Sequence, residues 1–209
     1  MVITYSGLSF IRLSFGNLVI GLNPVAKGHK IKTARFGADI VMTSLNSEAF
    51  NGVSELSFGN KESFVIDGPG EYEYSEVFVK GYPSIGPYGR INTIYSFLLE
   101  GMRVVHLGAL ALKDLPPDVL EELSGADILF VPVGDEGTLD GKASFKLATS
   151  LEPKIVIPVL YGEDVKSDLM KEFLLEAGGD ISQAVDKLSI KKKDLEDKTI
   201  EPIILTVSK

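Results

Sequence analysis

The stretch from residue 39 to residue 53 reads Asp39-Ile40-Val41-Met42-Thr43-Ser44-Leu45-Asn46-Ser47-Glu48-Ala49-Phe50-Asn51-Gly52-Val53. It begins with a short apolar run, Ile40 to Met42, which predicts a buried β-strand. Small and polar side chains follow at once, and active sites are commonly built where a chain leaves a strand with such residues. This stretch therefore provides the frame in which the rest of the chain is interpreted.

The composition is typical of a globular protein with an acidic surface. The chain has 209 residues, of which 44% are hydrophobic and 24% are charged, and its formal net charge is -8. This negative charge argues against non-specific binding to nucleic acid or to an anionic membrane. No apolar run approaches the roughly 18 residues of a membrane-spanning helix, and the segment from Met1 to Tyr5 lacks the basic residues of a secretory signal. We expect a cytoplasmic protein without nucleic-acid or membrane partners.

Thiol and imidazole side chains, the usual nitrogen and sulfur ligands of transition metals, are scarce in this chain. It contains no cysteine and only two histidines, His29 and His106. A catalytic zinc usually takes about three protein ligands, most often His with Asp or Glu. We therefore expect no metal site, no stoichiometric zinc and no other cofactor. We interpret His29, which is surrounded by lysines, as a solvated loop residue, and His106, at the end of an apolar run, as a structural residue.

The order of the expected elements favours two packed sheets covered by helices. Alternating apolar runs predict strands over 2–5, 9–15, 17–22, 63–66, 71–74, 77–81, 92–100 and 103–107, with a Gly/Pro-rich loop at 82–90. Helices expected to end near 123, 151 and 177 then alternate with strands at 126–131 and 154–160, the last two helices beginning at Thr138 and Asp164. A doubly wound α/β sheet is the alternative, which the strand-rich first half disfavours. No linker divides the chain, so we expect one domain over residues 1–209.

Three motifs together resemble the metallo-β-lactamase superfamily, and in particular its branch of small Zn-dependent hydrolases. In that family an apolar strand leads into Thr/Ser-His-x-His-x-Asp-His, and later segments read His-Leu-Gly-Asp and Ile-Pro-x-His-Tyr-Gly. The matching stretches here are residues 43–49, His106-Leu107-Gly108-Ala109 and Ile157-Pro158-Val159-Leu160-Tyr161-Gly162. The resemblance extends from Met1 to Val207. It implies an α/β fold, namely an αββα sandwich of two mixed β-sheets flanked by helices.

The resemblance also implies that the metal ligands of the family have been replaced here. The matching ligand positions carry Ser44, Asn46, Glu48, Ala49, Gly86, Ala109 and Leu160. In addition, Leu8 and Asn23 stand where the family has the histidine of Gly-His-Ser and the aspartate of Asp-Pro. One carboxylate without a cluster of nitrogen donors suits, at best, weak binding of Mg²⁺ or Ca²⁺. A degenerate member of the family is therefore expected.

Three functional interpretations remain open at this point. The favoured one is a metal-free pseudoenzyme that serves binding or assembly. The alternative is a hydrolase of esters, lactones or phosphodiesters with a rebuilt, metal-independent or weak-metal site, for which Ser44, Glu48 and His106 are the candidate catalytic residues. The third is a structural subunit whose surface contacts a protein partner or a second copy of the chain. The sequence alone identifies no substrate, ligand or partner.

Overall fold

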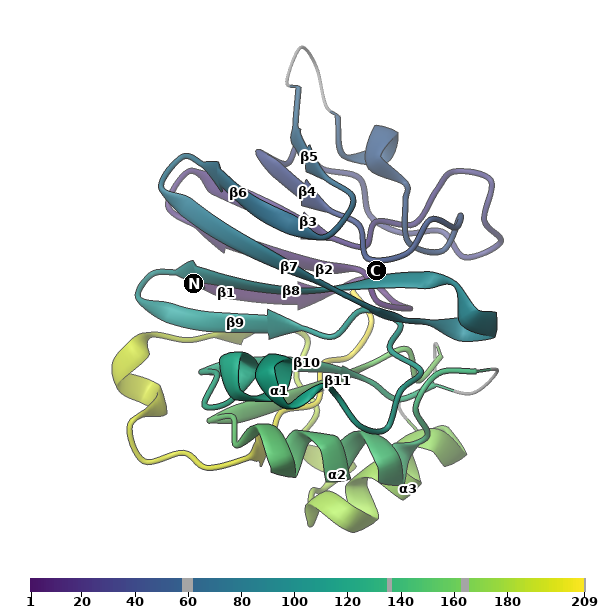
Figure 1. Ribbon diagram of the computed structural model, residues 1–209, viewed down its shortest axis with the longest axis vertical. Coiled ribbons are helices and arrows are strands. Elements are labelled where there is room, and N and C mark those ends of the chain that lie inside the picture. Colours follow the sequence, from purple (N-terminus) through teal and green to yellow (C-terminus); the bar gives the residue numbers. More distant parts are fainter. Residues whose placement is uncertain (58–61, 135–136, 163–165, 209) are drawn as a thin grey trace.

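Two β-sheets lie face to face, and helices cover part of the outer surface of one of them (Figure 1). The computed structural model describes residues 1–57, 62–134, 137–162 and 166–208. Within these residues, one sheet has the strand order β12-β1-β2-β3-β4-β5 and the other has the order β13-β11-β10-β9-β8-β7-β6. Both sheets contain parallel and antiparallel pairs. The expected αββα sandwich is thereby confirmed, and the doubly wound alternative is wrong.

The first sheet is built mainly from the first third of the chain. Its strands are β1 (Val2–Tyr5), β2 (Ile11–Phe15), β3 (Leu18–Leu22), β4 (Ile40–Met42), β5 (Phe64–Ile66) and the late addition β12 (Leu188–Ser189). Strands β1, β2 and β3 form an antiparallel meander, and β4 and β5 continue the sheet in parallel. All residues of β4 are buried, as its unbroken apolar run predicts.

The second sheet combines long hairpins with parallel strands. Its strands are β6 (Gly70–Tyr74), β7 (Val77–Ile85), β8 (Ile91–Leu99), β9 (Met102–His106), β10 (Ile128–Pro132), β11 (Ile155–Val159) and β13 (Glu201–Pro202). Strands β6 to β9 are antiparallel, whereas β9, β10, β11 and β13 run parallel to one another. The parallel strands β10 and β11 are buried throughout.

The described α-helices are α1 (Pro117–Leu123), α2 (Gly141–Leu151) and α3 (Asp168–Ala177). Short 3₁₀ turns occupy η1 (Val53–Leu56), η2 (Pro87–Gly89), η3 (Ile181–Gln183) and η4 (Lys192–Leu195). The start expected for the last helix, Asp164, lies outside the described residues. Within the described part of the chain, none of the helices combines the length and hydropathy needed to cross a membrane.

Strand β7 is longer than the sequence predicts, because it continues through Pro83 to Ile85. A loop was expected from residue 82 onward. The strand remains paired with β8 as far as Ile85 and Ile91, but its pairing with β6 ends at Gly81. Pro83 therefore lies where one side of the strand has no neighbour in the sheet, and proline, which lacks an N–H group, is tolerated at such edges.

Candidate functional site

The loops that follow β4, β9 and β11 meet at one edge of the sandwich. Gly108, just after β9, lies so close to Ser44 that a Cβ atom added to it would be 2.6 Å from the Ser44 hydroxyl oxygen. A Cβ atom on Gly86 would be 3.2 Å from the backbone carbonyl oxygen of Ala109. Leu160, just after β11, packs against the cluster that contains Ala109. The positions matched to the family's ligands on these segments are therefore neighbours in space.

An apolar cluster lies where these loops meet. Leu45, Phe50 and Ala109 are buried together, and Ala49 and Leu160 pack against them. Three of these five residues, namely Ala49, Ala109 and Leu160, are at matched ligand positions. Their side chains offer van der Waals contact but no lone pair to a cation. We refer to these five residues as the apolar cluster.

A chain of uncharged polar groups lies beside the apolar cluster and joins the two sheets. The Asn23 carbonyl oxygen Oδ1 accepts the backbone N–H of Ser44 over 2.7 Å, and the Asn23 amide donates to the Ser9 hydroxyl over 3.1 Å. The same Ser9 hydroxyl lies 3.3 Å from Nε2 of His106. Ser9, Asn23 and His106 are all almost completely buried. Buried polar groups that bond one another in this way fix the relative position of the strands that carry them.

His106 is held as a neutral side chain. Its Nδ1 atom accepts the backbone N–H of Gly108 over 2.9 Å, so the ring proton resides on Nε2 and points toward Ser9. Burial lowers the pKa of His106 to about 4, because the interior disfavours the charged ring. A ring nitrogen that already carries a proton cannot accept the proton of Ser9. The Ser9–His106 pair therefore does not form an activated nucleophile.

Asn92, in β8, is a buried polar residue of this region that the sequence did not reveal. Its amide donates to the carbonyl oxygen of Leu107 over 3.0 Å and to the hydroxyl of Ser84 over 2.8 Å. Its carbonyl oxygen accepts the backbone N–H of Ala109 over 2.8 Å. Asn92 thus secures both sides of the Gly108 turn. The sequence shows only that Asn92 is a polar residue near the start of a predicted strand, which does not identify its partners.

The three candidate catalytic residues are not joined by hydrogen bonds within the described part of the chain. The hydroxyl of Ser44 is buried and has no hydrogen-bond partner among the described residues. Glu48 is exposed, and its carboxylate lies toward Gly28 in the preceding loop. His106 is engaged as described above. The remaining matched position, Asn46, is also exposed and accepts a hydrogen bond from the amide of Asn51 over 2.6 Å.

An open depression of about 330 Å³ lies over the apolar cluster. Its lining consists of Leu8, Leu45, Ser47, Phe50, Pro87, Tyr88, Arg90, Gly134, Thr138 and Leu160. Three bulky residues in this lining, Leu8, Tyr88 and Leu160, have positive φ angles of 51°, 57° and 68°. L-residues with large side chains rarely adopt this conformation, which costs roughly 1–2 kcal/mol each. The chain thus maintains a shaped surface here despite a conformational cost.

The donor set at this edge does not fit a catalytic metal. Within residues 1–57, 62–134, 137–162 and 166–208, no group of three or more His, Cys, Asp or Glu side chains is arranged to hold a metal ion. A zinc site of the hydrolase type requires about three such ligands. We therefore derive no metal-dependent step for this protein.

Comparison with known proteins agrees with the geometry. The family model "Beta-lactamase superfamily domain" matches residues 2–160, and the chain therefore belongs to the metallo-β-lactamase superfamily. A structure of a proposed Zn-dependent hydrolase of this superfamily from Thermotoga maritima has 26% identity and a TM-score of 0.76, with 99% of each chain covered. No curated protein sequence matches this chain.

Two more distant structures share the fold. A proposed metal-dependent hydrolase from Parabacteroides distasonis has 18% identity and a TM-score of 0.68, with 99% of this chain and 93% of that chain covered. A metallo hydrolase from the archaeon Ignicoccus hospitalis has 14% identity and a TM-score of 0.65, with 100% of this chain and 96% of that chain covered. The resemblance inferred from the motifs is thereby confirmed.

Proposed function

We propose that this protein is a member of the metallo-β-lactamase superfamily that has lost its metal site and serves binding or assembly without hydrolysis. The observation that carries the proposal is the apolar cluster, in which Ala49, Ala109 and Leu160 occupy matched ligand positions and pack with Leu45 and Phe50. Water at neutral pH is a poor nucleophile unless a bound metal lowers its pKa. With alanine and leucine at these positions, the family's means of activating water is missing.

The surface above the apolar cluster supports a role in contact rather than in catalysis. The strained conformations of Leu8, Tyr88 and Leu160 place apolar side chains around the depression. Backbone strain persists only where the surrounding structure enforces it, and it concentrates at sites that bind or switch. Arg90 is the cationic residue of this lining. The same edge of the fold that serves catalysis in metallohydrolases would then present a shaped, largely apolar contact surface.

The positions of Ser44, Glu48 and His106 do not support the alternative of a hydrolase with a rebuilt catalytic site. Ser44 lacks a base, Glu48 faces the loop at Gly28, and His106 carries its proton toward Ser9. A serine nucleophile needs a base within hydrogen-bond reach and a donor for the developing oxyanion. We therefore keep this alternative as an outcome of the test rather than as a second proposal.

We also propose that the chain acts as a single domain. One continuous hydrophobic cluster contains buried residues of both sheets and all three α-helices, from Met1 to Leu205. The N-terminal ammonium group of Met1 bonds to the carboxylate of Glu100 and to the carbonyl oxygen of Ile190, which come from distant parts of the chain. Neither sheet could unfold without exposing the apolar face of the other.

The proposal is tested by assaying the purified full-length chain against carboxylic esters, lactones and phosphodiesters. Each substrate is assayed without added metal and with Zn²⁺, Fe²⁺ or Mn²⁺. We expect rates equal to those of buffer with the same metal. Turnover that disappears in Glu48→Ala or His106→Ala, but persists in a matched surface variant such as Glu172→Ala, would favour the rebuilt hydrolase instead.

A further inference from the structure

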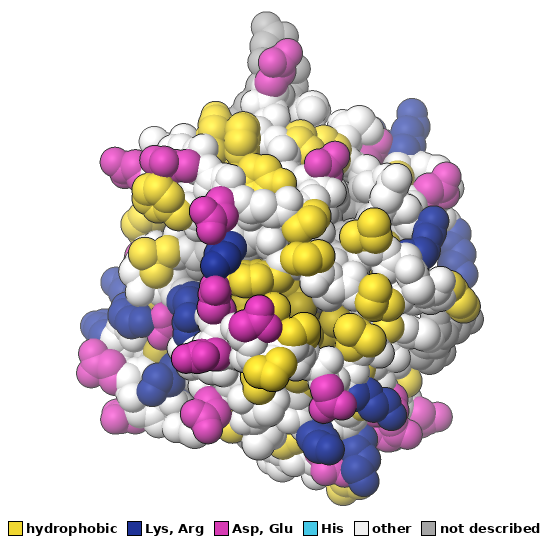
Figure 2. Space-filling view, in the orientation of Figure 1, with side chains coloured by type: hydrophobic (Ala, Val, Ile, Leu, Met, Phe, Trp, Pro, Cys, Tyr) yellow, Lys and Arg dark blue, Asp and Glu magenta, His cyan; other side chains and the backbone are white. Residues whose placement is uncertain are grey.

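The outer face of the second sheet is only partly covered. The α-helices lie over the part of the sheet that contains β10 and β11, whereas strands β6, β7 and β8 face the viewer without a helix in front of them (Figure 1). On this bare part, Phe78 in β7 is 59% exposed and Leu98 in β8 is 52% exposed. Figure 2 shows hydrophobic side chains gathered over the centre of this face. Because Phe78 and Leu98 lie on the same open sheet face, this face is a candidate contact surface.

The strand register places four side chains of this face in one row. Glu73 in β6 pairs with Phe78 in β7, and Leu98 in β8 pairs with Arg103 in β9. Val79 pairs with Phe97, so Phe78 and Leu98 are the next opposed residues of the antiparallel ladder. The row therefore reads acid, apolar, apolar, base across four neighbouring strands. We call these four residues the cross-strand row.

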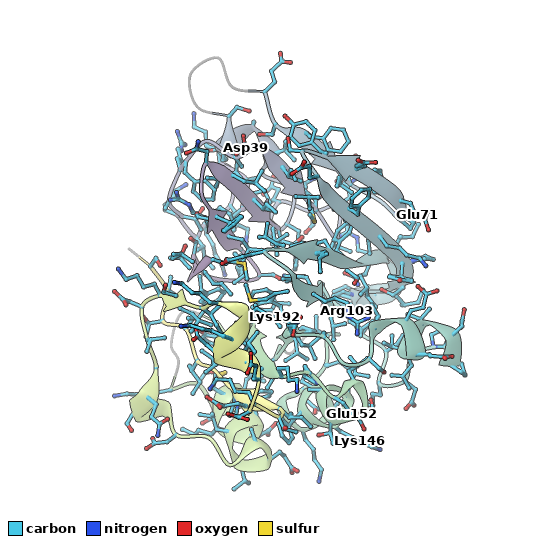
Figure 3. The ribbon with its side chains drawn as sticks, turned by 90° about the vertical axis from the view of Figure 1, so that its left-hand side faces the viewer. Asp39, Glu71, Arg103, Lys146, Glu152 and Lys192 are labelled. Carbon is cyan, nitrogen blue, oxygen red and sulfur yellow. The ribbon has the colours of Figure 1, made fainter. Side chains whose placement is uncertain are left out.

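Neither charged end of the row forms an ion pair with a residue that the structure describes. Glu73 is exposed and makes no ion pair with any described residue. The guanidinium group of Arg103 donates to the backbone carbonyl oxygens of Glu122 and Ser124, which hold it in place without neutralising its charge. Three strand spacings, roughly 14 Å, separate the two charged residues. Within one chain they cannot meet, and in Figure 3 Arg103 lies well apart from Glu71, the neighbour of Glu73 along the same face of β6.

We propose that the cross-strand row is the centre of an interface with a second copy of this chain. A two-fold axis lying in the interface, parallel to the strands and between β7 and β8, would place β6 of one copy over β9 of the other. Glu73 of each copy then faces Arg103 of the other, and Phe78 faces Leu98. A row that is acidic at one end and basic at the other is self-complementary under this operation, as a symmetric dimer requires.

The self-complementary charge pattern favours a second copy of this chain as the binding partner. An unrelated partner would need its own base–apolar–apolar–acid pattern at strand spacing, whereas a second copy already has it. A groove of about 350 Å³, lined in part by Phe78, Leu98 and Arg103, offers space for the opposing aromatic ring. Because Arg103 is already held in place by α1, little side-chain freedom remains to be lost when the ion pair forms. This inference specifies the assembly role in the proposed function as self-association, and it rests on the proposed function only for that role.

The strength of the contact follows from its composition. In the dimer, the two-fold axis generates two apolar pairs between Phe78 and Leu98 and two ion pairs between Glu73 and Arg103. The ion pairs lie toward the rim of the interface. Such an interface gives a reversible dimer that dissociates on dilution, and its affinity falls as salt is added because rim charges are screened. Lys80 does not take part, because its ammonium group is already paired with Glu122.

The test is sedimentation equilibrium of the full-length chain over a series of concentrations. Wild type is expected to shift from monomer to dimer as concentration rises. Glu73→Arg and Arg103→Glu should each weaken the dimer at least about tenfold, because each places like charges opposite one another. The double variant with both substitutions restores opposite charges, so it should recover most of the affinity. Phe78→Ser should also weaken the dimer.

Controls separate this interface from other causes. Leu175→Ser removes an apolar side chain on α3 that is even more exposed, at 82%, and should leave the equilibrium unchanged. Circular dichroism checks that Arg103→Glu still folds; should it not, Glu73→Arg and Phe78→Ser carry the test. A strictly monomeric wild type, or a dimer that survives these substitutions, overturns the proposal. Either result leaves the metal-free assignment standing, whereas metal-dependent turnover by an intact dimer would remove the proposed function and retain the interface.

Discussion

Gly108 donates its backbone N–H to Nδ1 of His106 over a distance of 2.9 Å, and this bond determines what the histidine can do. The ring must carry its proton on Nε2, toward the hydroxyl of Ser9. The histidine thus joins the end of β9 to the first sheet through Ser9 and Asn23. A residue that lies in the family's His-Leu-Gly segment acts here as part of the frame that holds the strand ends together.

The neutral state of His106 makes stability depend on pH. Burial lowers its folded pKa to about 4, below the ordinary value. Its contribution to stability is therefore complete above about pH 6.5 and is lost as the pH falls toward the folded pKa. The shift corresponds to roughly 3 kcal/mol over this interval, at about 1.4 kcal/mol per pKa unit. Urea unfolding of wild type and His106→Asn between these pH values measures the effect, because asparagine does not titrate. Parallel pH profiles for the two proteins would contradict the assignment.

Ser44 and Asn23 should respond very differently to truncation. The Ser44 hydroxyl has no partner among the described residues, so Ser44→Ala should change the free energy of unfolding by less than about 0.5 kcal/mol or stabilise the protein. Asn23→Ala removes two hydrogen bonds and leaves the buried N–H of Ser44 unsatisfied, so it should cost about 2 kcal/mol or more. Chemical denaturation of both variants gives the comparison. Equal losses would mean that the Ser44 hydroxyl is bonded after all.

Gly108 should be far less tolerant of substitution than Gly89, although both have positive φ angles, of 65° and 73°. A Cβ atom on Gly108 would lie 2.4 Å from Oδ1 of Asn92, whereas one on Gly89 would meet nothing within 4 Å. Gly89→Ala should therefore cost about 1 kcal/mol for the backbone alone. Gly108→Ala should cost about 3 kcal/mol or more, because it also disrupts buried hydrogen bonds. Similar midpoints of unfolding for the two variants would show that the turn is not tightly packed.

Much of the fold could be predicted from local patterns. The apolar run at 40–42 predicts β4, and Gly178 ends α3 with a positive φ angle of 63°. Helix α2 begins at Gly141 rather than at Thr138, because the Asp140 carboxylate caps it by accepting the backbone N–H of Ala143 over 2.7 Å. Such caps can be seen in the sequence only once the exact helix boundary is known.

The interior of the candidate site was less predictable. The motifs predict which positions match the family's ligands, but not what fills the space between them. Phe50 and Ala109 are distant in the sequence, and only the meeting of the loops brings them into one cluster. Asn92 likewise acts through backbone groups of another strand and its turn, which no local pattern reveals. Strand β7 can continue through Pro83 because its pairing with β6 ends at Gly81. The end of that pairing is a tertiary property, which the local sequence does not show.

Under the proposed function, apolar and uncharged side chains stand where the family has its metal ligands. Elemental analysis of the full-length chain is the decisive experiment, after purification without chelators and dialysis against trace Zn²⁺, Fe²⁺ and Mn²⁺. We predict well below one equivalent of any transition metal per chain, because Ala49, Ala109 and Leu160 supply no donor atoms from their side chains. One or two tightly bound equivalents of zinc, iron or manganese per chain would show that the protein retains a metal site.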